Sequence, residues 1–425
     1  MLRTALMEKK NIVILGGGFA GLICAKHLSA EQFEVTLVDR WNHHLFQPLL
    51  YQVATAGLSA PEIAQPLRSI LSDHKNVTTI MDQVVSVDLE KRTIELKAHH
   101  LSYDYLIIAL GAKTGFFGNN HWEQFTLGLK SLDDAMRIRR EVLLAFERAE
   151  ASPDAKEVKR QMTLVVVGGG PTGVEMAGAL AELSGVVLKG DFRHIDPTLT
   201  EVHLIEAGPR LLPTFEENLS AYTQTRLESL GVTVRLQSPV SEVGEGYVIA
   251  GGQRLESQVI IWAAGVEASP VTRTLADIPL DRGGRIQVLP DLSLPGHPEV
   301  FAAGDIVSLT DKNGVRVPGV SPAAIQMGQH IVKILNGGLK EGERPAYAYF
   351  DKGSMATIGR KAAVASIANR TVKGFPAWLL WLFVHLVFLI GMRNRISVFL
   401  HWVWSYFTWQ RGARIIFGQP SDEKR

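Results

Sequence analysis

The chain contains 425 residues, of which 46% are hydrophobic, and is long enough for two or three domains with cores of their own. Its 44 basic and 43 acidic residues leave a net charge of +1, so no overall field indicates nucleic-acid binding. A single cysteine, Cys24, excludes a disulfide redox pair and an iron–sulfur cluster, and the thirteen histidines lack the spacing of zinc ligands.

The first predicted element is an apolar strand over residues 12–15 that leads through a glycine-rich turn into a helix. Gly16 permits a tight turn, Gly18 lets the backbone approach a pyrophosphate, and Gly21 lets the helix pack closely on the strand. The next strand ends at Asp39, 23 residues after Gly16, where a carboxylate can accept a ribose hydroxyl. The pattern is a dinucleotide fingerprint, although Asp39 taken alone also fits a strand end that faces water.

The region after this fingerprint contains strands and a long helix. Residues 84–110 alternate apolar and polar side chains, which predicts antiparallel strands. Ser131 and Asp134 form a predicted capping box at the start of a helix over residues 132–149.

A second fingerprint follows 152 residues after the first. Gly168, Gly170 and Gly173 come directly after an apolar strand over residues 164–167 and open another helix. Two such sites in one chain indicate two bound dinucleotides and electron transfer between them.

The acidic partner of the second fingerprint is Glu206, 38 residues after Gly168, which exceeds the usual separation of about 20 residues. We attribute the extra length to a charged surface segment over residues 189–200. A glutamate favours a free ribose 2′-hydroxyl and therefore NADH, while the nearby Arg210 leaves NADPH open. A solvated strand end is the alternative role for Glu206 as well.

A third motif, EVFAAGDIVS over residues 299–308, closes an apolar strand on Gly304 and Asp305. Alone it is one more acidic turn, whose carboxylate can reach a ligand hydroxyl because the glycine permits close approach. Together, the three motifs resemble the two-dinucleotide-binding flavoprotein superfamily. The resemblance implies FAD on the first fingerprint, NAD(P)H on the second, and Asp305 near the flavin ribityl chain. It also implies that residues 106–112 and 259–266 are the two crossover returns.

The C-terminal tail differs in composition from the rest of the chain. It holds five of the eight tryptophans, namely Trp378, Trp381, Trp402, Trp404 and Trp409. Residues 375–392 form an 18-residue run in which His385 is the only polar side chain, which equals the threshold of about 18 residues for a spanning helix. A second apolar run covers residues 396–409.

Three interpretations of this tail remain: a spanning helix, a pair of helices lying in one leaflet, and a buried dimer interface. The in-plane pair keeps all the flanking arginines near anionic head groups, and these are Arg393, Arg395, Arg411 and Arg414. Spanning carries Arg393 and Arg395 across the bilayer, against the positive-inside bias. Because Met1–Lys10 has no apolar segment of the length that a secretion signal needs, we expect the catalytic part on the cytoplasmic face of the membrane.

Nearly the whole chain resembles the type II NADH:quinone oxidoreductases, which are single-subunit, non-pumping dehydrogenases. The similarity is carried by HHLFQPLLYQVATAGL (residues 43–58), FAAGD (301–305), VPGVSPAAIQMGQ (317–329), FDKGSMATIGR (350–360) and the tail ending in QRGAR. The resemblance implies that residues 46–52 lie beside the flavin and the quinone passage. A membrane quinone is therefore the expected electron acceptor.

The family's AQxAxQ quinone motif corresponds to SPAAIQ at residues 321–326. Ala324 and Gln326 match the motif, whereas Pro322 replaces the first glutamine and leaves the quinone type open. Pro322 also fits the first turn of a helix, and Gln326 alone fits a helix-surface amide. Glu175 matches the family's glutamate near the nicotinamide; its alternative is a first-turn carboxylate stabilised by the helix dipole.

The expected fold class is α/β, with two Rossmann-like dinucleotide-binding domains, the NADH domain inserted in the FAD domain, and a C-terminal amphipathic membrane-anchoring helical tail. The expected boundaries are 1–115 and 287–340 for the FAD-binding domain, 116–286 for the NADH-binding domain with its linker, and 341–425 for the membrane-association region.

The expected activity is hydride transfer from NADH to FAD and electron transfer to a quinone, with no metal. An oxidase or reductase with another acceptor and a membrane-tethered redox sensor are the alternatives, and a homodimer stays open. The candidate catalytic residue is Glu175. The candidates on the FAD side are Gly16, Gly18, Phe19, Ala20, Gly21, Asp39, Arg40, Gln47, Ala109, Gly111, Gly304, Asp305 and Ala324. The candidates on the NADH side are Gly168, Gly170, Thr172, Gly173, Glu206, Ala264 and Gly265, and those for the quinone are Gln47, Gln52, Ala324 and Gln326.

Overall fold

The structure is a computed structural model that describes residues 8–368, 370–408 and 412–416. The chain divides into two compact units, each assembled from three separate stretches. The first unit comprises Met1–Leu45, Ala64–Lys113 and Val266–Lys352, and the second comprises Phe46–Ile63, Thr114–Gly265 and Gly353–Arg425. The stretch 114–265 of the second unit lies between two stretches of the first, as the expected insertion requires. The stretch 46–63, expected in the FAD-binding domain, clusters with the second unit.

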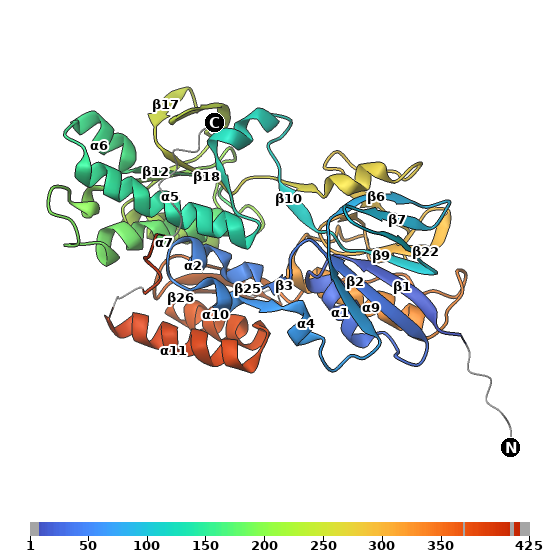
Figure 1. Cartoon of the computed structure of the whole chain (residues 1–425). Coiled ribbons are helices and arrows are strands. Elements are labelled where there is room, and N and C mark those ends of the chain that lie inside the picture. Colours follow the sequence, from blue (N-terminus) through green and yellow to red (C-terminus); the bar gives the residue numbers. More distant parts are fainter. Residues whose placement is uncertain (1–7, 369, 409–411, 417–425) are drawn as a thin grey trace, which may run out of the picture. The chain divides into compact units, whose positions relative to one another are not determined.

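The first unit is built on a six-stranded sheet with the order β21-β22-β9-β1-β2-β5 (Figure 1). Its strands are β1 (Lys10–Leu15), β2 (Phe33–Asp39), β5 (Val77–Met81), β9 (Tyr105–Ile108), β21 (Ser293–Leu294) and β22 (His297–Ala302). All neighbours except β21 and β22 pair in parallel. Because β2 and β9 lie on opposite sides of β1, the strand order reverses there, which is the usual place of a nucleotide in such sheets.

Helices and smaller sheets complete the first unit. The helices are α1 (Phe19–His27), α4 (Leu67–Ile70), α9 (Ser321–Asn336) and the 3-10 turn η5 (Pro270–Thr274). The predicted antiparallel strands are confirmed as β6 (Val84–Asp88), β7 (Thr93–Leu96) and β8 (His100–Ser102). Three two-stranded pairs join β3 (His43–Leu45) with β4 (Ala64–Pro66), β10 (Ala112–Thr114) with β19 (Val266–Ala268), and β20 (Ile286–Gln287) with β23 (Val307–Ser308).

Helices α1 and α9 of this unit pack closely against each other. A Cβ on Gly328 would lie 2.8 Å from the carbonyl oxygen of Ala20, so only glycine permits the approach. The thiol of Cys24 is fully buried and donates to the carbonyl of Gly328 at 3.6 Å. The single cysteine is therefore a packing residue, and burial raises the pKa of its thiol to about 12.

The second unit repeats the plan with a five-stranded parallel sheet in the order β11-β18-β12-β13-β14. Its strands are β11 (Leu127–Gly128), β12 (Thr163–Val167), β13 (Glu201–Ile205), β14 (Val232–Arg235) and β18 (Val259–Trp262). Its long helices are α5 (Leu132–Ala151), α6 (Ala155–Gln161), α7 (Pro171–Glu182) and α8 (Glu217–Ser229), and the short ones are α2 (Leu50–Ala54) and α3 (Ala60–Ile63). The capping box of Ser131 and Asp134 at α5 is confirmed.

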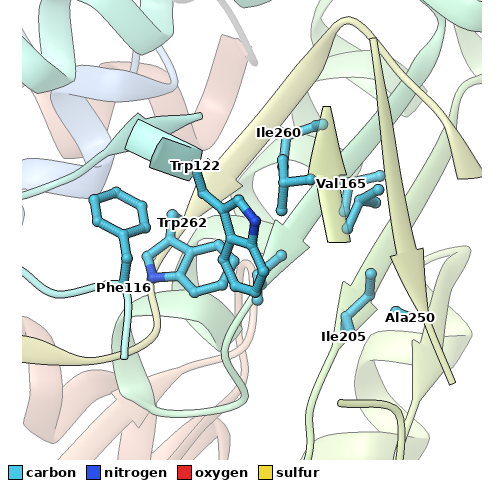
Figure 2. Packing of buried hydrophobic residues seen from close by; sticks show 10 residues of the cluster. Phe116, Trp122, Val165, Ile205, Ala250, Ile260 and Trp262 are labelled. Atoms are coloured by element: carbon cyan, nitrogen blue, oxygen red, sulfur yellow. The ribbon is translucent and has the colours of Figure 1, made fainter. Parts of the chain in front are cut away.

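An aromatic cluster anchors one end of this sheet. Figure 2 shows Trp262 between Phe116 and Trp122. The ring centroid of Trp262 lies 5.4 Å from that of Phe116 and 5.5 Å from that of Trp122. The indole Nε1–H of Trp262 donates to the carbonyl of Gly115 at 3.0 Å, so its polar atom is satisfied inside the core. An antiparallel sheet covers the cluster with β15 (Val240–Gly244), β16 (Tyr247–Ala250) and β17 (Gln253–Glu256).

The tail begins with a sheet that the sequence patterns did not predict. Its strands are β24 (Ser354–Thr357), β25 (Ala363–Ile367) and β26 (Arg370–Gly374), and they precede helices α10 (Phe375–Phe388) and α11 (Met392–Thr408). The apolar run 375–392 is not one helix, since α10 ends at Phe388. Within the described residues, no helix combines the length and apolar character that crossing a membrane requires. Trp409 and Arg411 lie outside the described residues.

Candidate functional site

The first glycine turn joins β1 to α1 and leaves no space for side chains. Gly16 has φ +104°, and a Cβ there would lie 2.3 Å from the carbonyl oxygen of Ala109. A Cβ on Gly21 would lie 1.9 Å from the carbonyl oxygen of Gly16. Gly18 differs, because nothing lies within 4 Å of its Cβ position and it caps α1 without a side-chain hydrogen bond. The open surface at Gly18 and the positive end of the helix dipole suit a diphosphate.

Asp39 fastens this turn from the end of β2. One carboxylate oxygen accepts the amide of Gly17 at 2.6 Å, and the other accepts the amide of Trp41 at 2.7 Å. Burial raises the pKa of Asp39, although both amides act in the opposite direction. Since a carboxylate has about four acceptor positions, Asp39 retains capacity for ribose hydroxyls. The neighbouring Arg40 is exposed, with its guanidinium 5.5 Å from the centre of the Trp41 ring.

His44 is a further residue of this turn that sequence reasoning missed. Its Nδ1 lies 2.9 Å from the carbonyl oxygen of Gly17, and because a carbonyl only accepts, Nδ1 carries the proton. Burial lowers the pKa of His44 to about 4, so the ring is neutral at physiological pH. Its Nε2 is buried without a hydrogen-bond partner among the described residues, and the ring meets Phe19 edge-on at 5.0 Å. The motif over residues 43–58 contains His44 but gave it no role, because an adjacent pair of histidines also fits an exposed strand.

Two further strands of the same sheet end in glycine turns at the same edge. Gly111 follows β9 with φ +66°, and Gly304 follows β22 with φ +84°. The amide of Gly304 donates to the sulfur of Met327 at 3.2 Å, and a Cβ on Gly304 would lie 3.6 Å from that of Ala324 on α9. Helix α9 also begins without a side-chain cap. Ala20 and Ala109 are buried within this edge, and Asp305 is half-buried beside Gly319.

The first unit therefore offers a cradle that fits one dinucleotide. It combines tight glycine turns, two helix N-termini without side-chain caps, an acid at the end of β2, and the Nε2 nitrogen of His44, which has no hydrogen-bond partner among the described residues. Parallel strands bring all of these to the carboxyl edge of one sheet.

The second glycine turn has the same geometry. Gly168 has φ +113°, and its Cβ would lie 2.9 Å from the carbonyl carbon of Ala263 and the amide nitrogen of Ala264. A Cβ on Gly173 would lie 1.8 Å from the carbonyl oxygen of Gly168, whereas the position on Gly170 is open. Helix α7 begins at Pro171 without a side-chain cap, Thr172 is exposed in its first turn, and Gly265 follows β18 with φ +73°.

Glu206 takes the place of Asp39 in this turn. Its carboxylate accepts the amide of Gly169 at 2.6 Å and the amide of Gly208 at 2.6 Å. Arg210 donates to the carbonyl of Pro213 at 2.9 Å and lies 3.7 Å from the carboxylate of Glu217.

Two features account for the long separation between the second glycine turn and Glu206. Helix α7 continues as the π-helix η3 (Leu183–Val187), which the sequence patterns did not predict. The segment that follows is mostly exposed and contains the short turn η4 (Pro197–Leu199). Glu150 holds this segment by accepting the backbone amides of Arg193, His194 and Ile195.

Glu175 lies on α7 and is buried within the second unit, with 9% of its surface exposed. One carboxylate oxygen accepts the amide of Thr357 at 3.3 Å. Burial raises the pKa of Glu175 to about 8, despite opposite contributions from the Thr357 amide and the Trp381 indole. A carboxyl group with this pKa exchanges a proton near neutral pH, which general acid–base chemistry requires.

The glutamines expected at the quinone already have protein partners. In the second unit, the amide nitrogen of Gln47 donates to the carbonyl of Lys130 at 3.1 Å, and Gln52 donates to the hydroxyl of Tyr51 at 3.0 Å. In the first unit, Gln326 and the backbone of Phe350 exchange two hydrogen bonds, at 3.0 Å and 2.9 Å. The structure thus describes the quinone candidates as two groups, one with Ala324 and Gln326 and one with Gln47 and Gln52.

The two tail helices carry an exposed apolar stripe. Its residues recur at helical spacing, and they are Phe375, Leu379, Phe383, Val387 and Phe388 on α10 with Met392, Ile396, Phe399, Leu400, Val403, Trp404 and Phe407 on α11. Their other faces are buried through Ala377, Trp381 and Val398. Arg395 donates from Nε to the carbonyl of Leu389 at 2.8 Å and so joins the two helices, while Arg393 is exposed.

A polar cluster holds α11 to α3. The carboxylate of Glu62 accepts the hydroxyl of Ser397 at 3.0 Å and lies 3.3 Å from Nδ1 of His401. Burial alone raises the pKa of Glu62, yet hydrogen bonds from His401 and from Ser59 hold it at about 2. The cluster lines an open cavity of about 520 Å³ beside Arg414, whose guanidinium pairs with Asp191.

Two family models match the chain. The first, described as pyridine nucleotide-disulphide oxidoreductase, matches residues 10–328, and the second, described as NDH2 C-terminal domain, matches residues 352–409. The type II NADH:quinone oxidoreductase Ndh of Mycobacterium tuberculosis is 42% identical over 97% of this chain and 92% of its own length. A type II NADH:quinone oxidoreductase of Haemophilus influenzae is 30% identical over 85% of this chain and 88% of its own length.

Solved structures share the fold. NDH2 from Plasmodium falciparum in complex with NADH superposes with a TM-score of 0.89 at 22% identity, covering 97% of this chain and 100% of that one. The sulfide:quinone oxidoreductase of Aquifex aeolicus reaches a TM-score of 0.72 at 18% identity, covering 94% of this chain and 95% of that one. The predicted fold class is therefore confirmed.

Proposed function

The chain belongs to the family of type II NADH:quinone oxidoreductases, and from this premise we propose that it transfers hydride from NADH to FAD and two electrons on to a quinone, without pumping protons. The observation that carries this proposal is the pair of glycine turns, each fastened by a carboxylate from the end of the next strand. FAD held in the first unit supplies the redox chemistry, and the protein's part is to align and shield the reactants.

The two units divide the cofactors between them. The first unit binds FAD through the turn at Gly16 and Gly18, Asp39, and the edge formed by Gly111 and Gly304. The second unit binds NADH through the turn at Gly168 and Gly170, with Glu206 on the ribose. In terms of the expected domains, 1–115 and 287–340 serve FAD, 116–286 serves NADH, and 341–425 serves membrane association, except that 46–63 belongs to the second unit and 266–286 to the first.

Glu206 selects NADH over NADPH. A 2′-phosphate there meets a carboxylate rather than a cation, and Arg210 is already engaged by Pro213 and Glu217. Glu175 lies two residues after Gly173 on the same helix, where it can hold or release a proton beside the nicotinamide.

Each unit offers its own candidates to a quinone, namely Ala324 and Gln326 in the first unit and Gln47 in the second, where both ends of the Gln52 amide already have partners. The amide group of a glutamine has two donor hydrogens, so Gln47 and Gln326 can each donate to a quinone carbonyl while keeping their present contacts. Ala324 leaves space beside Gly304.

The exposed apolar stripe docks the protein on the cytoplasmic face of a membrane. A stripe of twelve large apolar side chains on two adjacent helices exceeds the scattered exposure that is normal for soluble proteins. Both helices lie in the plane of the interface, with the exposed Arg393 near anionic head groups. If two copies of the chain instead bury this stripe against each other, the stripe is a dimer interface and the assignment to a membrane is wrong.

Steady-state turnover of the purified holoenzyme tests the function. We expect NADH oxidation that rises steeply when a ubiquinone or menaquinone analogue is added. An equal rate with oxygen as the only acceptor would identify an oxidase. Flavin reduction by NADH without acceptor-dependent turnover would identify a redox sensor.

A further inference from the structure

A chain of hydrogen bonds in the second unit connects helix α11 with Glu175 on α7. The indole Nε1–H of Trp402 donates to Oε1 of Gln52 at 2.9 Å, and Nε2 of Gln52 donates to the hydroxyl of Tyr51 at 3.0 Å. The Tyr51 hydroxyl lies 3.0 Å from Oγ1 of Thr357, whose backbone amide donates to Glu175 at 3.3 Å. The contacts join α11, α2, β24 and α7, which are far apart in sequence (Figure 1).

The donor and acceptor of the first two contacts are fixed by chemistry. An indole N–H can only donate, so the amide oxygen of Gln52 faces Trp402 and its nitrogen faces Tyr51. The Tyr51 oxygen accepts this bond, and the hydroxyls of Tyr51 and Thr357 share the next hydrogen bond, in which either oxygen can be the donor. Trp402 therefore determines which way the amide of Gln52 points, and so presents the Gln52 amide nitrogen as a donor to the Tyr51 oxygen.

The inner part of the chain is shielded from water. Tyr51, Thr357 and Glu175 have 7%, 4% and 9% of their surface exposed, whereas Gln52 and Trp402 are half-buried. Hydrogen bonds in such surroundings are stronger than in water, and a polar group that loses its partner there costs more. Because water cannot replace a hydrogen bond lost at the buried end of the chain, a change at Trp402 affects Tyr51, Thr357 and Glu175.

The elements packed against α7 supply the other titratable groups around Glu175. Tyr51 of α2 interacts with Glu175 and with Glu182, which accepts the amide of Arg360 from the β24–β25 turn. Four further titratable groups on neighbouring elements have partners of their own, and they are His385 of α10 on the Trp381 carbonyl, Arg226 of α8 on the Arg360 carbonyl, His203 of β13 near Glu201, and Arg235 of β14 on Gln253.

We propose that Trp402 is a positioning residue for Glu175, acting through Gln52, Tyr51 and Thr357, so that the seating of α11 fixes the buried carboxyl group. The proposal deepens the proposed function and rests on it, since Glu175 is the carboxyl assigned to the nicotinamide. It also gives Gln52 and Tyr51 a structural role in place of a direct contact with quinone.

The proposal predicts a direction for the titration of Glu175. The Thr357 amide lowers the pKa of Glu175 because it stabilises the carboxylate. Trp402→Phe removes the donor to Gln52, loosens the Tyr51 contact with Thr357 and so weakens that amide bond. The ionisation of Glu175 then moves to higher pH, by about 0.5 to 1 unit for a bond of ordinary strength.

The experiment titrates the protonated carboxyl of Glu175 by difference infrared spectroscopy on the full-length holoenzyme. The band is assigned as the one lost in Glu175→Gln. Tyr51→Phe breaks the same chain at a second place and keeps the test valid if Trp402→Phe does not fold. Ser397→Ala is the matched control, because it removes a hydrogen bond from the same helix to Glu62 on α3.

We expect the pH midpoint of the Glu175 titration to rise in Trp402→Phe and Tyr51→Phe and to stay unchanged in Ser397→Ala. The pH profile of NADH:quinone turnover should move in the same direction as this midpoint. An unchanged midpoint in both chain variants overturns the proposal. An equal shift in Ser397→Ala also overturns it, because the effect then reflects general loosening of α11. The infrared titration needs no quinone turnover, so a failure of the proposed function is seen separately.

Discussion

Glu206 accepts the backbone amide of Gly169, the middle glycine of the second turn, at 2.6 Å. Asp39 holds the same relationship to Gly17 in the first unit, also at 2.6 Å. Each acid also accepts an amide two residues further along the chain, from Gly208 and Trp41 respectively. The carboxylates are therefore parts of the turns themselves as well as candidate ribose acceptors.

Glu206→Gln should reduce the preference for NADH. The amide keeps one acceptor oxygen but loses the charge that disfavours a 2′-phosphate, so we expect the ratio of kcat/KM for NADH to that for NADPH to fall about tenfold, equivalent to about 1.4 kcal/mol. Glu201→Gln at the exposed start of β13 is the control. An unchanged ratio in Glu206→Gln would show that the acid only fastens the turn.

Gly168→Ala and Gly170→Ala should separate folding from binding. Gly168 has φ +113° and no space, so alanine there should lower the free energy of unfolding by about 2 kcal/mol or more. Gly170 has ordinary φ of −74° and an open Cβ position, so its variant should keep its Tm and lose affinity for NADH. Thermal melts and NADH titrations check both. Full NADH affinity in Gly170→Ala would place the pyrophosphate elsewhere.

The raised pKa of Glu175 predicts a pH-dependent stability. The folded state holds this proton up to about pH 8, whereas the unfolded chain releases it near 4.5, so stability falls as pH rises between these values. Glu175→Gln removes the ionisation, and its stability relative to the parent should increase by on the order of 2 kcal/mol between pH 5 and 8. Denaturant unfolding at both pH values measures this. A constant difference would mean that Glu175 ionises normally.

Glu62 should show the opposite dependence. Its folded-state pKa of about 2 lies below the unfolded value of 4.5, so its contribution is present above pH 4.5 and is lost as pH falls toward 2. Glu62→Gln should cost about 1 to 2 kcal/mol at pH 7 through weaker bonds to Ser397 and His401. The difference in unfolding free energy should shrink toward pH 3, and Ser72→Ala on the surface should have no effect.

Charges on the apolar stripe should release the protein from membranes. Phe383 and Phe407 are 65% and 77% exposed, and each contributes about 1.5 to 3 kcal/mol when buried in lipid. We expect Phe383→Asp with Phe407→Asp to reduce binding to anionic vesicles at least about tenfold in a flotation assay. Leu199→Asp, equally exposed but outside the tail, is the control. A dimer-to-monomer change with intact vesicle binding would assign the stripe to an interface between copies.

The glycine turns and their strands were predictable because local sterics determine them. A positive φ at Gly16 and Gly168, and backbone contacts too short for any Cβ, require glycine at fixed positions. The same holds for the capping box at Ser131, where both partners are three residues apart. Signals of this kind depend on neighbours in the sequence alone.

Contacts that depend on tertiary structure were not predictable. His44 reaches Gly17 across 27 residues, and Trp402 reaches Gln52 across 350. The strands at residues 354–374 were missed because they are short and lack a clear alternating pattern. The end of α10 at Phe388 was missed because apolar composition continues to Met392 without any helix-stop residue other than Gly391.

The turn before α11 fixes the rotation of this helix about its axis, and therefore which of its side chains face the protein. Arg395 binds the carbonyl of Leu389 at the start of the helix, and Trp402 meets Gln52 two turns later. Each residue of an α-helix advances about 100° around the axis, so one residue inserted between them would swing the indole nitrogen away from Gln52. The exposed apolar stripe tolerates replacement of one apolar side chain by another. The number of residues between Arg395 and Trp402 is instead fixed by the hydrogen bond that the Trp402 indole N–H donates to Gln52.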